Sequence, residues 1–165
     1  MKNNKKRAIY SGTFDPITKG HLDIIKRGLK VYDEIIIAVA DSSSKKPMFN
    51  LKQRIKLIKL ATTNIENIKI KPFKNLMVDF AKNENVYNII RGLRTNGDFE
   101  YELQLLYANR SLDKNFDTIF IMPTLKNSYI SSTVVRELIK FNGDYSHLVS
   151  KKVNKKIKKY IKKRV

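Results

Sequence analysis

The side chains of this sequence that are best suited to chemistry could hold phosphate groups. Gly20 and His21 open a stretch with helical spacing, directly after a short apolar run and the turn Ser11–Pro16. The first turn of a helix offers free backbone N–H groups and a positive dipole end to an anion. Glycine permits close backbone approach, and histidine can donate a hydrogen bond to a phosphate oxygen. A lone histidine near a helix start is more often structural, and the spacing is neither that of a dinucleotide fingerprint nor that of a P-loop.

Further candidates follow three other apolar runs. Arg91 and Arg94 flank Gly92–Leu93, and their planar, permanently charged guanidinium groups suit phosphate oxygens. Ser131–Thr133 opens another helical stretch, where hydroxyl groups commonly cap the first free amides. The pair Lys45–Lys46 would by itself be ordinary solvated surface. The sequence contains no cysteine, which excludes disulfides, thiolate metal sites and cysteine nucleophiles.

The elements that must position these residues alternate in type. Five short runs rich in β-branched residues alternate with helical patterns, which is typical of a parallel sheet wrapped by helices. The predicted strands are 7–10, 34–40, 68–72, 87–90 and 118–122. The predicted helices are 20–31, 51–62, 76–84, 99–112 and 131–141, followed by a basic helix at about 151–163. We therefore predict an α/β, doubly wound (Rossmann-like) fold in one domain, residues 1–165, with a five-stranded parallel sheet, helices on both faces and ligands beyond the carboxyl ends of the strands.

The net charge of the sequence bears on its possible partners. Lysine and arginine exceed aspartate and glutamate by 34 − 15 = 19, and nine of the basic residues lie in 151–165, which has no acidic residue. Val153, Ile157, Tyr160 and Ile161 form one apolar stripe in this segment, which favours a packed C-terminal helix with a solvated lysine face. Contact with RNA, acidic lipid or a polyanionic substrate is the alternative. The apolar run after the basic N-terminus is too short for a signal peptide or a membrane span, so we expect a cytoplasmic protein without membrane contact.

Four segments together resemble one enzyme family. Residues 18–21, Thr-Lys-Gly-His, match the T/HxGH signature of the nucleotidyltransferase superfamily, and residues 10–16 resemble the loop that precedes it in phosphopantetheine adenylyltransferases. Residues 42–49, the Arg-Gly-Leu-Arg loop with the following Phe-Glu-Tyr-Glu, and the ISSTxxR-like stretch 128–136 are similar to further motifs of that family. The resemblance runs from residue 7 to about 147. It implies transfer of the adenylyl group of ATP to 4′-phosphopantetheine, giving dephospho-coenzyme A and pyrophosphate.

The resemblance also implies roles for individual residues. His21 would stabilise the transition state, with Lys45 and Arg91 holding the phosphate of the acceptor. The residues implied in ATP binding are Thr13, Phe14, His21, Gly92, Leu93, Arg94, Glu102, Asn127, Ser128, Tyr129, Ile130, Ser131, Ser132 and Thr133, and those implied in pantetheine binding are Thr13, Lys45, Met77 and Arg91. From spacing alone, Met77 can equally be a core methionine and Glu102 an exposed helix residue. Asn127 departs from the family pattern, in which many members carry an aromatic residue.

The family further implies Mg²⁺ as cofactor, held through the ATP phosphates rather than by protein side chains, a homohexamer, and feedback binding of coenzyme A. Two other functions remain open. A related nucleotidyltransferase would act on nicotinate mononucleotide or a small alcohol phosphate. A nucleic-acid-binding module, which the net charge of +19 suggests, would show salt-dependent binding without ATP turnover, and we do not expect nucleic acid as a partner.

Overall fold

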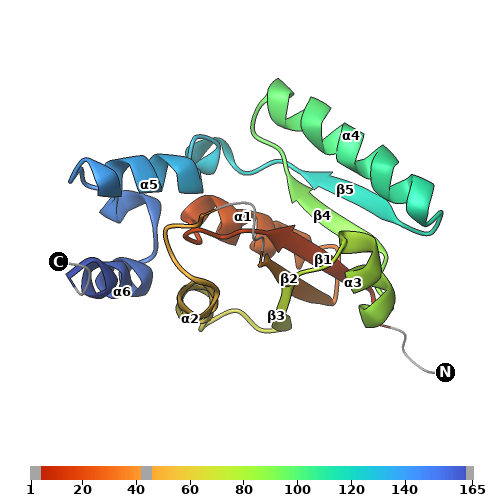
Figure 1. The fold of residues 1–165 in the computed structure, drawn as a ribbon, viewed down its shortest axis with the longest axis horizontal. Helices are drawn as coiled ribbons and strands as arrows, with labels where there is room; N and C mark the ends of the chain where they lie inside the picture. The colour runs from red at the N-terminus through yellow and green to blue at the C-terminus, as the bar shows by residue number, and fades with distance from the viewer. Residues whose placement is uncertain (1–4, 42–45, 163–165) are drawn as a thin grey trace.

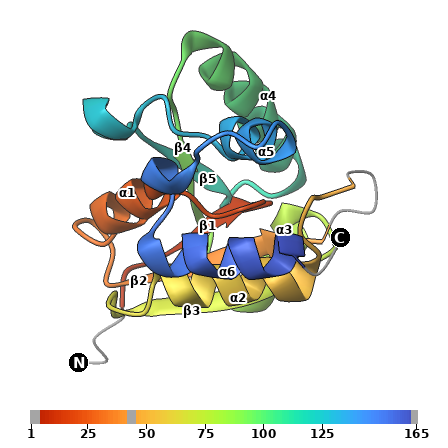
Figure 2. The same ribbon diagram turned by 90° about the vertical axis from the view of Figure 1, so that its left-hand side faces the viewer.

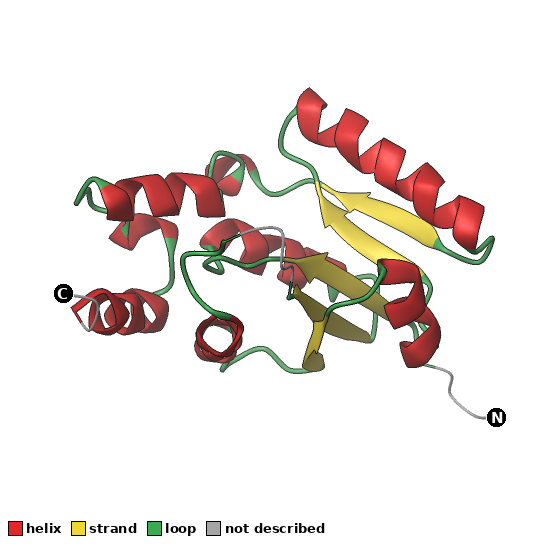
Figure 3. Ribbon diagram, in the orientation of Figure 1, coloured by secondary structure: helices red, strands yellow, loops and turns green. Residues whose placement is uncertain are grey.

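Five parallel strands form one sheet in the computed structural model, which describes residues 5–41 and 46–162. The strands are β1 (Arg7–Gly12), β2 (Glu34–Ala40), β3 (Ile68–Phe73), β4 (Asn88–Gly92) and β5 (Asp117–Ile121). Their order across the sheet is β3-β2-β1-β4-β5, and every neighbouring pair is parallel. Figures 1 and 3 show the strands surrounded by helices. The predicted doubly wound sheet is confirmed.

The strand order creates the place where a ligand can bind. The chain moves from β1 to β2 and β3 in one direction, and then returns to the other side of β1 to form β4 and β5. The loops that leave β1 and β4 therefore diverge, and such a switch point in a parallel sheet leaves a crevice at the carboxyl ends of the strands. Both the Gly12–His21 segment and the arginine loop leave the sheet at this point.

The helices cover both faces of the sheet because neighbouring residues of each strand point to opposite sides. One face packs against α1 (Lys19–Gly28), α2 (Leu51–Ala61) and α5 (Ser132–Lys140), and the other against α3 (Met77–Glu84). The helix α4 (Asn96–Leu112) contacts α3 and β5. The run Ile35–Val39 is completely buried, as the lack of alternation in its sequence predicts.

The basic segment at the end of the chain folds as predicted. It forms α6 (Lys151–Lys162), which lies beside α2 (Figure 2). Val153 and Ile157 are fully buried, while the Tyr160 ring packs at 6.1 Å from that of Phe49. The apolar stripe of α6 thus belongs to the core, and its lysines face outward. Across the described ranges 5–41 and 46–162, no helix combines the length and the apolar character needed to span a membrane.

Several element boundaries differ from the predicted ones. Most shift by one or two residues, but α1 ends three residues earlier and α4 begins three residues earlier than expected. The start of α4 moves because the Thr95 side chain accepts a hydrogen bond from the Asp98 amide and so caps the helix. Two short 3₁₀ turns, Leu125–Asn127 and Ser146–Leu148, were not expected from the sequence.

Candidate active site

A cavity of about 600 Å³ opens at the carboxyl ends of β1 and β4. Its walls come from the loop after β1, the first turn of α1, the loop after β4, and the segment that leads into α5. Lys46 and Pro47, which follow β2, close a further side. The cavity thus lies at the switch point of the sheet, where this fold class binds its ligands.

The first turn of α1 holds His21 in one orientation. The Thr18 side chain caps the His21 amide, while the Thr18 amide donates a 3.0 Å hydrogen bond to Nδ1 of His21. Because a backbone N–H can only donate, Nδ1 must be unprotonated, and the ring proton of the neutral imidazole lies on Nε2. Burial, assisted by the positive charge of Arg94, lowers the pKa of His21 from 6.5 to about 4. At neutral pH this ring is therefore an uncharged Nε2–H donor in the cavity wall.

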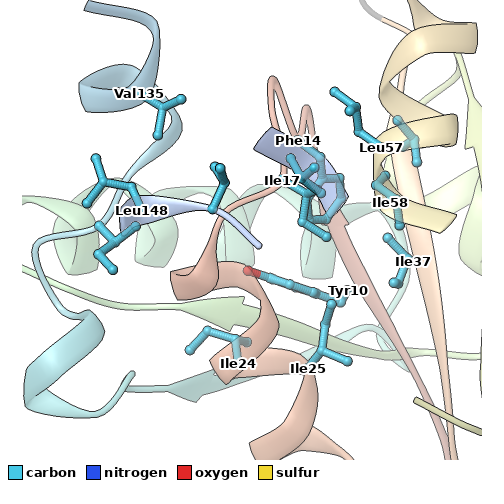
Figure 4. Packing of buried hydrophobic residues seen from close by; sticks show 14 of the residues in the cluster. Tyr10, Phe14, Ile17, Ile24, Ile25, Ile37, Leu57, Ile58, Val135 and Leu148 are labelled. Carbon is cyan, nitrogen blue, oxygen red and sulfur yellow. The ribbon is translucent and has the colours of Figure 1, made fainter. Parts of the chain in front are cut away.

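Aromatic rings support His21 from the side of β1. Phe14 is 2% exposed, and its ring centroid lies 5.3 Å from that of Tyr10 and 5.1 Å from that of His21, both edge-on. Phe14 shares its hydrophobic cluster with Ile17, Leu57 and other residues drawn in Figure 4. Burial raises the pKa of Tyr10 far above its ordinary value, although Arg91 and Arg94 oppose the shift. Tyr10 is therefore a neutral hydroxyl in the cavity wall.

Two buried charged groups fix the loop after β1. The Asp15 carboxylate, 3% exposed, accepts hydrogen bonds from the amides of Met48 at 2.7 Å and Phe49 at 2.8 Å. The Arg54 guanidinium, 1% exposed, donates to the carbonyl oxygens of Thr13 at 2.7 Å, Ala40 at 2.8 Å and Phe49 at 3.0 Å. Burial lowers the pKa of Arg54 while the charge of Asp15 counteracts the shift. The loops after β1 and β2 are thus joined into one rigid rim.

The loop after β4 carries the two predicted arginines. Arg91 pairs with both carboxylate oxygens of Glu102, and its Nη1 donates to the carbonyl and hydroxyl oxygens of Ser11 at 2.9 Å. Arg94 is more exposed and pairs with Asp98, one helical turn later, at 3.0 Å. Both arginines line the cavity. Of the carboxylates paired with them, Glu102 lines the cavity and Asp98 does not.

The start of α5 closes the opposite side. The Ser132 hydroxyl donates to the carbonyl oxygen of Pro16 at 2.7 Å, and Arg136 Nη1 donates to that of Asp15 at 2.7 Å. The amides of Ser132 and Thr133 lie in the first helical turn, so they have no acceptor within the helix. They are therefore available to an anion in the cavity, whose wall includes both residues.

Gly20 allows α1 to lie close to the segment that leads into α5. A Cβ atom at residue 20 would lie 2.7 Å from the carbonyl oxygen of Ile130. Nearby, Nδ2 of the Asn127 side chain donates to the Thr124 hydroxyl at 3.1 Å. The backbone amide and the hydroxyl of Thr124 in turn donate to the Asp23 carboxylate at 2.6 and 2.8 Å. Many members of the family that the sequence resembles carry an aromatic residue at position 127. Asn127 instead forms part of a polar network.

Most of the predicted site residues converge on the cavity. Those in its wall are Thr13, Phe14, His21, Arg91, Gly92, Arg94, Glu102, Asn127, Ile130, Ser131, Ser132 and Thr133. Leu93, Ser128 and Tyr129 belong to the same loops but are not among the wall residues. Met77 begins α3 and packs, partly buried, against the cluster on the other face of the sheet. Lys45 lies outside the described residues, whereas its neighbour Lys46 lines the cavity.

Several important residues were not predicted. Tyr10, Ser11, Asp15 and Arg136 line the cavity, and Arg54 lies behind it. Asp15 and Arg136 belong to the two motifs already recognised in the sequence, so a functional role could have been considered there. Arg54 has no comparable signal, because an arginine within a helical pattern is normally exposed.

The described parts of the chain, 5–41 and 46–162, contain no group of three or more His, Cys, Asp or Glu residues that could hold a metal ion. The two carboxylates that line the cavity are both engaged, Asp15 with backbone amides and Glu102 with Arg91.

Together, the parallel sheet and a cation-rich cavity at its switch point, with two helix starts in the wall, are typical of an α/β protein that binds phosphate groups, as the nucleotidyltransferases do. In agreement, the sequence model of the family described as cytidylyltransferase-like matches residues 9–138. Similar proteins called phosphopantetheine adenylyltransferase occur in Nautilia profundicola, 55% identical over 89% of this chain and 96% of the relative, and in Helicobacter hepaticus, 57% identical over 87% of each. A third similar protein, from Campylobacter jejuni strain RM1221, is 54% identical over 88% of this chain and 92% of the relative. The chain belongs to the phosphopantetheine adenylyltransferase family.

Proposed function

We propose that this protein transfers the adenylyl group of Mg·ATP to the phosphate of 4′-phosphopantetheine, giving dephospho-coenzyme A and pyrophosphate. The observation that carries the proposal is the convergence of a neutral histidine donor, Arg91, Arg94 and the start of α5 on one cavity at the switch point. The names of the relatives support the choice of acceptor. Mg²⁺ enters as part of the substrate Mg·ATP, since the carboxylates of the wall are engaged.

The reaction needs little acid–base chemistry from the protein. A phosphate oxygen of the acceptor attacks the α-phosphorus of ATP, and the bond from that phosphorus to the bridging oxygen of the β-phosphate breaks as pyrophosphate leaves. The acceptor phosphate carries about −1.5 to −2 charge near neutral pH, so it is already a nucleophile. The main difficulty is bringing two polyanions together, and the protein must supply position and positive potential.

The wall residues fit separate parts of this reaction. His21, as a neutral Nε2–H donor, is suited to an α-phosphate oxygen on which negative charge grows. Arg91, with Lys45 as the sequence resemblance implies, is suited to the acceptor phosphate. Arg94 and the free amides at Ser132 and Thr133 are suited to the β- and γ-phosphates that depart.

The remaining predicted ligands complete the proposal. Thr13 would bridge the two substrates, and Phe14, Gly92, Leu93, Glu102 and the segment 127–131 would follow the nucleotide. Met77 would contact the pantetheine arm. Its position at the start of α3, against the opposite core cluster, makes it the least supported of these residues. Asn127 would offer an amide rather than a ring to the nucleotide.

A homohexamer is part of the proposal, and the surface of α4 supports self-association. Of the residues of α4, all of which the structure describes, only Glu102 is buried. Apolar side chains along it stay open to solvent, with Tyr101, Tyr107 and Leu112 each more than half exposed. A second copy of the chain would cover them.

We also propose that coenzyme A binds to the cavity as a feedback ligand, because it contains both moieties of the product. We further propose that the reaction takes place in the cytoplasm.

The test is pyrophosphate release from Mg·ATP by the purified protein, with 4′-phosphopantetheine, nicotinate mononucleotide or glycerol 3-phosphate offered in parallel. We expect release with 4′-phosphopantetheine alone. Release with one of the other two would assign the chain a different acceptor, and no release with any of them from folded protein would refute the proposed reaction.

A further inference from the structure

Asp23 is the only acidic residue of α1, and its carboxylate is bound to a residue 101 positions later in the chain. Its Oδ2 accepts hydrogen bonds from the backbone amide of Thr124 at 2.6 Å and from the Thr124 hydroxyl at 2.8 Å. Desolvation raises the pKa of Asp23, but the bonds from Thr124, together with Asn127 and Arg27, outweigh it and leave this pKa below its ordinary value. Asp23 is therefore an ionised acceptor at neutral pH.

The segment that Asp23 binds, residues 123–127, forms part of the cavity wall through Pro123 and Asn127. None of the residues in its 3₁₀ turn is buried, so the turn gains little from hydrophobic packing. The Asn127 amide donates to the Thr124 carbonyl oxygen at 2.8 Å, a bond that lies within the segment. The two bonds from Thr124 to Asp23 instead fasten the segment to α1.

A chain of hydrogen bonds continues from Asp23 to the side chain of Asn127. An ionised carboxylate can only accept, so the Thr124 hydroxyl gives its proton to Asp23 and is left to accept a further bond. The 3.1 Å contact between this hydroxyl and Asn127 must therefore be made by the NH₂ end of the Asn127 amide. Asp23 thus determines which end of the amide faces Thr124, and with it the orientation of the amide.

We propose that Asp23 is a positioning residue for the nucleotide, which acts through Thr124 to hold residues 123–127 and the Asn127 amide in the geometry that binds ATP. This inference rests on the proposed adenylyl transfer, in which the segment 127–131 follows the nucleotide. The charge of Asp23 alone would have the opposite effect, because a carboxylate repels a polyphosphate. The sign of the effect on ATP binding therefore distinguishes positioning from simple electrostatics.

The first test is the steady-state kinetics of Asp23→Ala, which removes both hydrogen bonds and places a strong helix former in α1. If the segment then keeps its binding geometry for about a tenth of the time, the KM for ATP should rise about 10-fold. The KM for 4′-phosphopantetheine, and kcat at saturating ATP, should stay within about twofold of wild type, which a general loss of structure would not allow.

The conservative variant Asp23→Asn keeps an acceptor oxygen and should restore most of the ATP affinity, also if Asp23→Ala folds poorly in circular dichroism. A KM for ATP in Asp23→Ala that equals or falls below that of wild type would overturn the proposal. A KM for ATP in Asp23→Asn as high as that of Asp23→Ala would do the same.

Asp33 provides a matched control for the loss of a carboxylate. It is exposed and also accepts a backbone amide from a distant segment, that of Lys6 at 2.8 Å. It directly precedes β2, however, and so lies at the amino ends of the strands rather than at the cavity. Asp33→Ala should leave the KM for ATP unchanged. An equal increase in both variants would indicate a general effect of charge or stability and would contradict the role of Asp23.

A double-mutant cycle tests the route through Thr124. Thr124→Val removes only the hydroxyl and should itself raise the KM for ATP, because the bond to Asn127 is lost. Asp23→Ala should then raise this KM by a smaller factor than it does in wild type. Two factors that multiply in full would mean that Asp23 acts by another route, and would refute the proposal.

Binding of ATP without an acceptor separates this inference from the proposed reaction. Mg·ATP, titrated calorimetrically, should bind about 10-fold more weakly to Asp23→Ala than to wild type. If this difference is found but wild type turns over no acceptor, the proposed reaction alone fails. Equal affinities of the two proteins, or no binding of Mg·ATP to wild type, would overturn the role of Asp23.

Discussion

The neutral state of His21 should be visible in how stability depends on pH. Its pKa is lowered from 6.5 to about 4 in the folded protein, mainly by burial and further by the charge of Arg94. Between these two values the unfolded chain binds a proton that the folded chain does not, so the free energy of unfolding decreases as pH falls. The contribution is fully present above about pH 7 and is lost as pH falls through 6.5 towards 4.

The two pKa values set the size of this effect. They would make the free energy of unfolding about 2 kcal/mol lower at pH 5 than at pH 7.5, and we expect about 1–2 kcal/mol because the ring is partly open to the cavity. Urea unfolding of wild type and His21→Gln between pH 7.5 and 5 measures the difference between their slopes. The exposed His147, the second of the two histidines, provides His147→Gln as the control for loss of an imidazole.

Parallel curves for wild type and His21→Gln would show that His21 is not held neutral by the fold. A second observable is independent of stability. Long-range nitrogen–proton spectra of the imidazole should show the proton on Nε2 at pH 7, because the Thr18 amide donates to Nδ1. A signal from the Nδ1–H form would contradict the role of His21 as an Nε2–H donor.

Three other substitutions, one of them with a matched control, test the packing around the cavity and the proposed chemistry. Arg54→Met should lower the free energy of unfolding in urea by about 3–5 kcal/mol, since three buried carbonyl groups lose their donor; a loss under about 1 kcal/mol would mean that the contacts contribute little. Gly20→Ala should cost about 1–3 kcal/mol because its Cβ would lie 2.7 Å from the Ile130 carbonyl oxygen. Gly97→Ala, a helical position where the added Cβ would lie 4.0 Å from the Thr95 hydroxyl oxygen, should instead stabilise slightly, and equal effects of the two would exclude the steric explanation. His21→Ala should lower kcat at least ~10²-fold in the pyrophosphate assay, and near-normal turnover would rule out its assigned role.

Local signals in the sequence were sufficient for the architecture. Buried parallel strands are continuous apolar runs, and the run Ile35–Val39 is distinct because both faces of β2 are covered. The stripe of α6 was visible because Val153 and Ile157 recur at helical spacing. The start of α4 was less accessible to prediction. Asn96 and Gly97 are poor helix formers, and the cap that makes them helical depends on the geometry of the Thr95 side chain.

The candidate site was predictable where a single loop carries the signal. The position of His21 at the site could be predicted because its loop, turn and helix are contiguous in sequence, and that of the arginines because they follow a strand, whereas the role of His21 came from the family resemblance. Pairings between distant segments could not be predicted. The contact between Arg91 and Glu102 depends on how α4 lies over the sheet, and that of Arg54 with Thr13 joins residues 41 positions apart. Such contacts follow from tertiary packing, which no local pattern records.

The rim that Asp15 and Arg54 build also affects how the protein can open. These buried charges connect the loop after β1 with the end of β2 and the start of α2, and Arg136 adds a connection to α5. Local unfolding of this loop would leave several buried charges without partners at once, so its cost approaches that of unfolding the whole domain. Amide hydrogens of Met48 and Phe49, which donate to Asp15, should therefore exchange with solvent almost as slowly as those of the central strands. Although it consists of loops, the rim of the cavity would belong to the most slowly exchanging part of the protein.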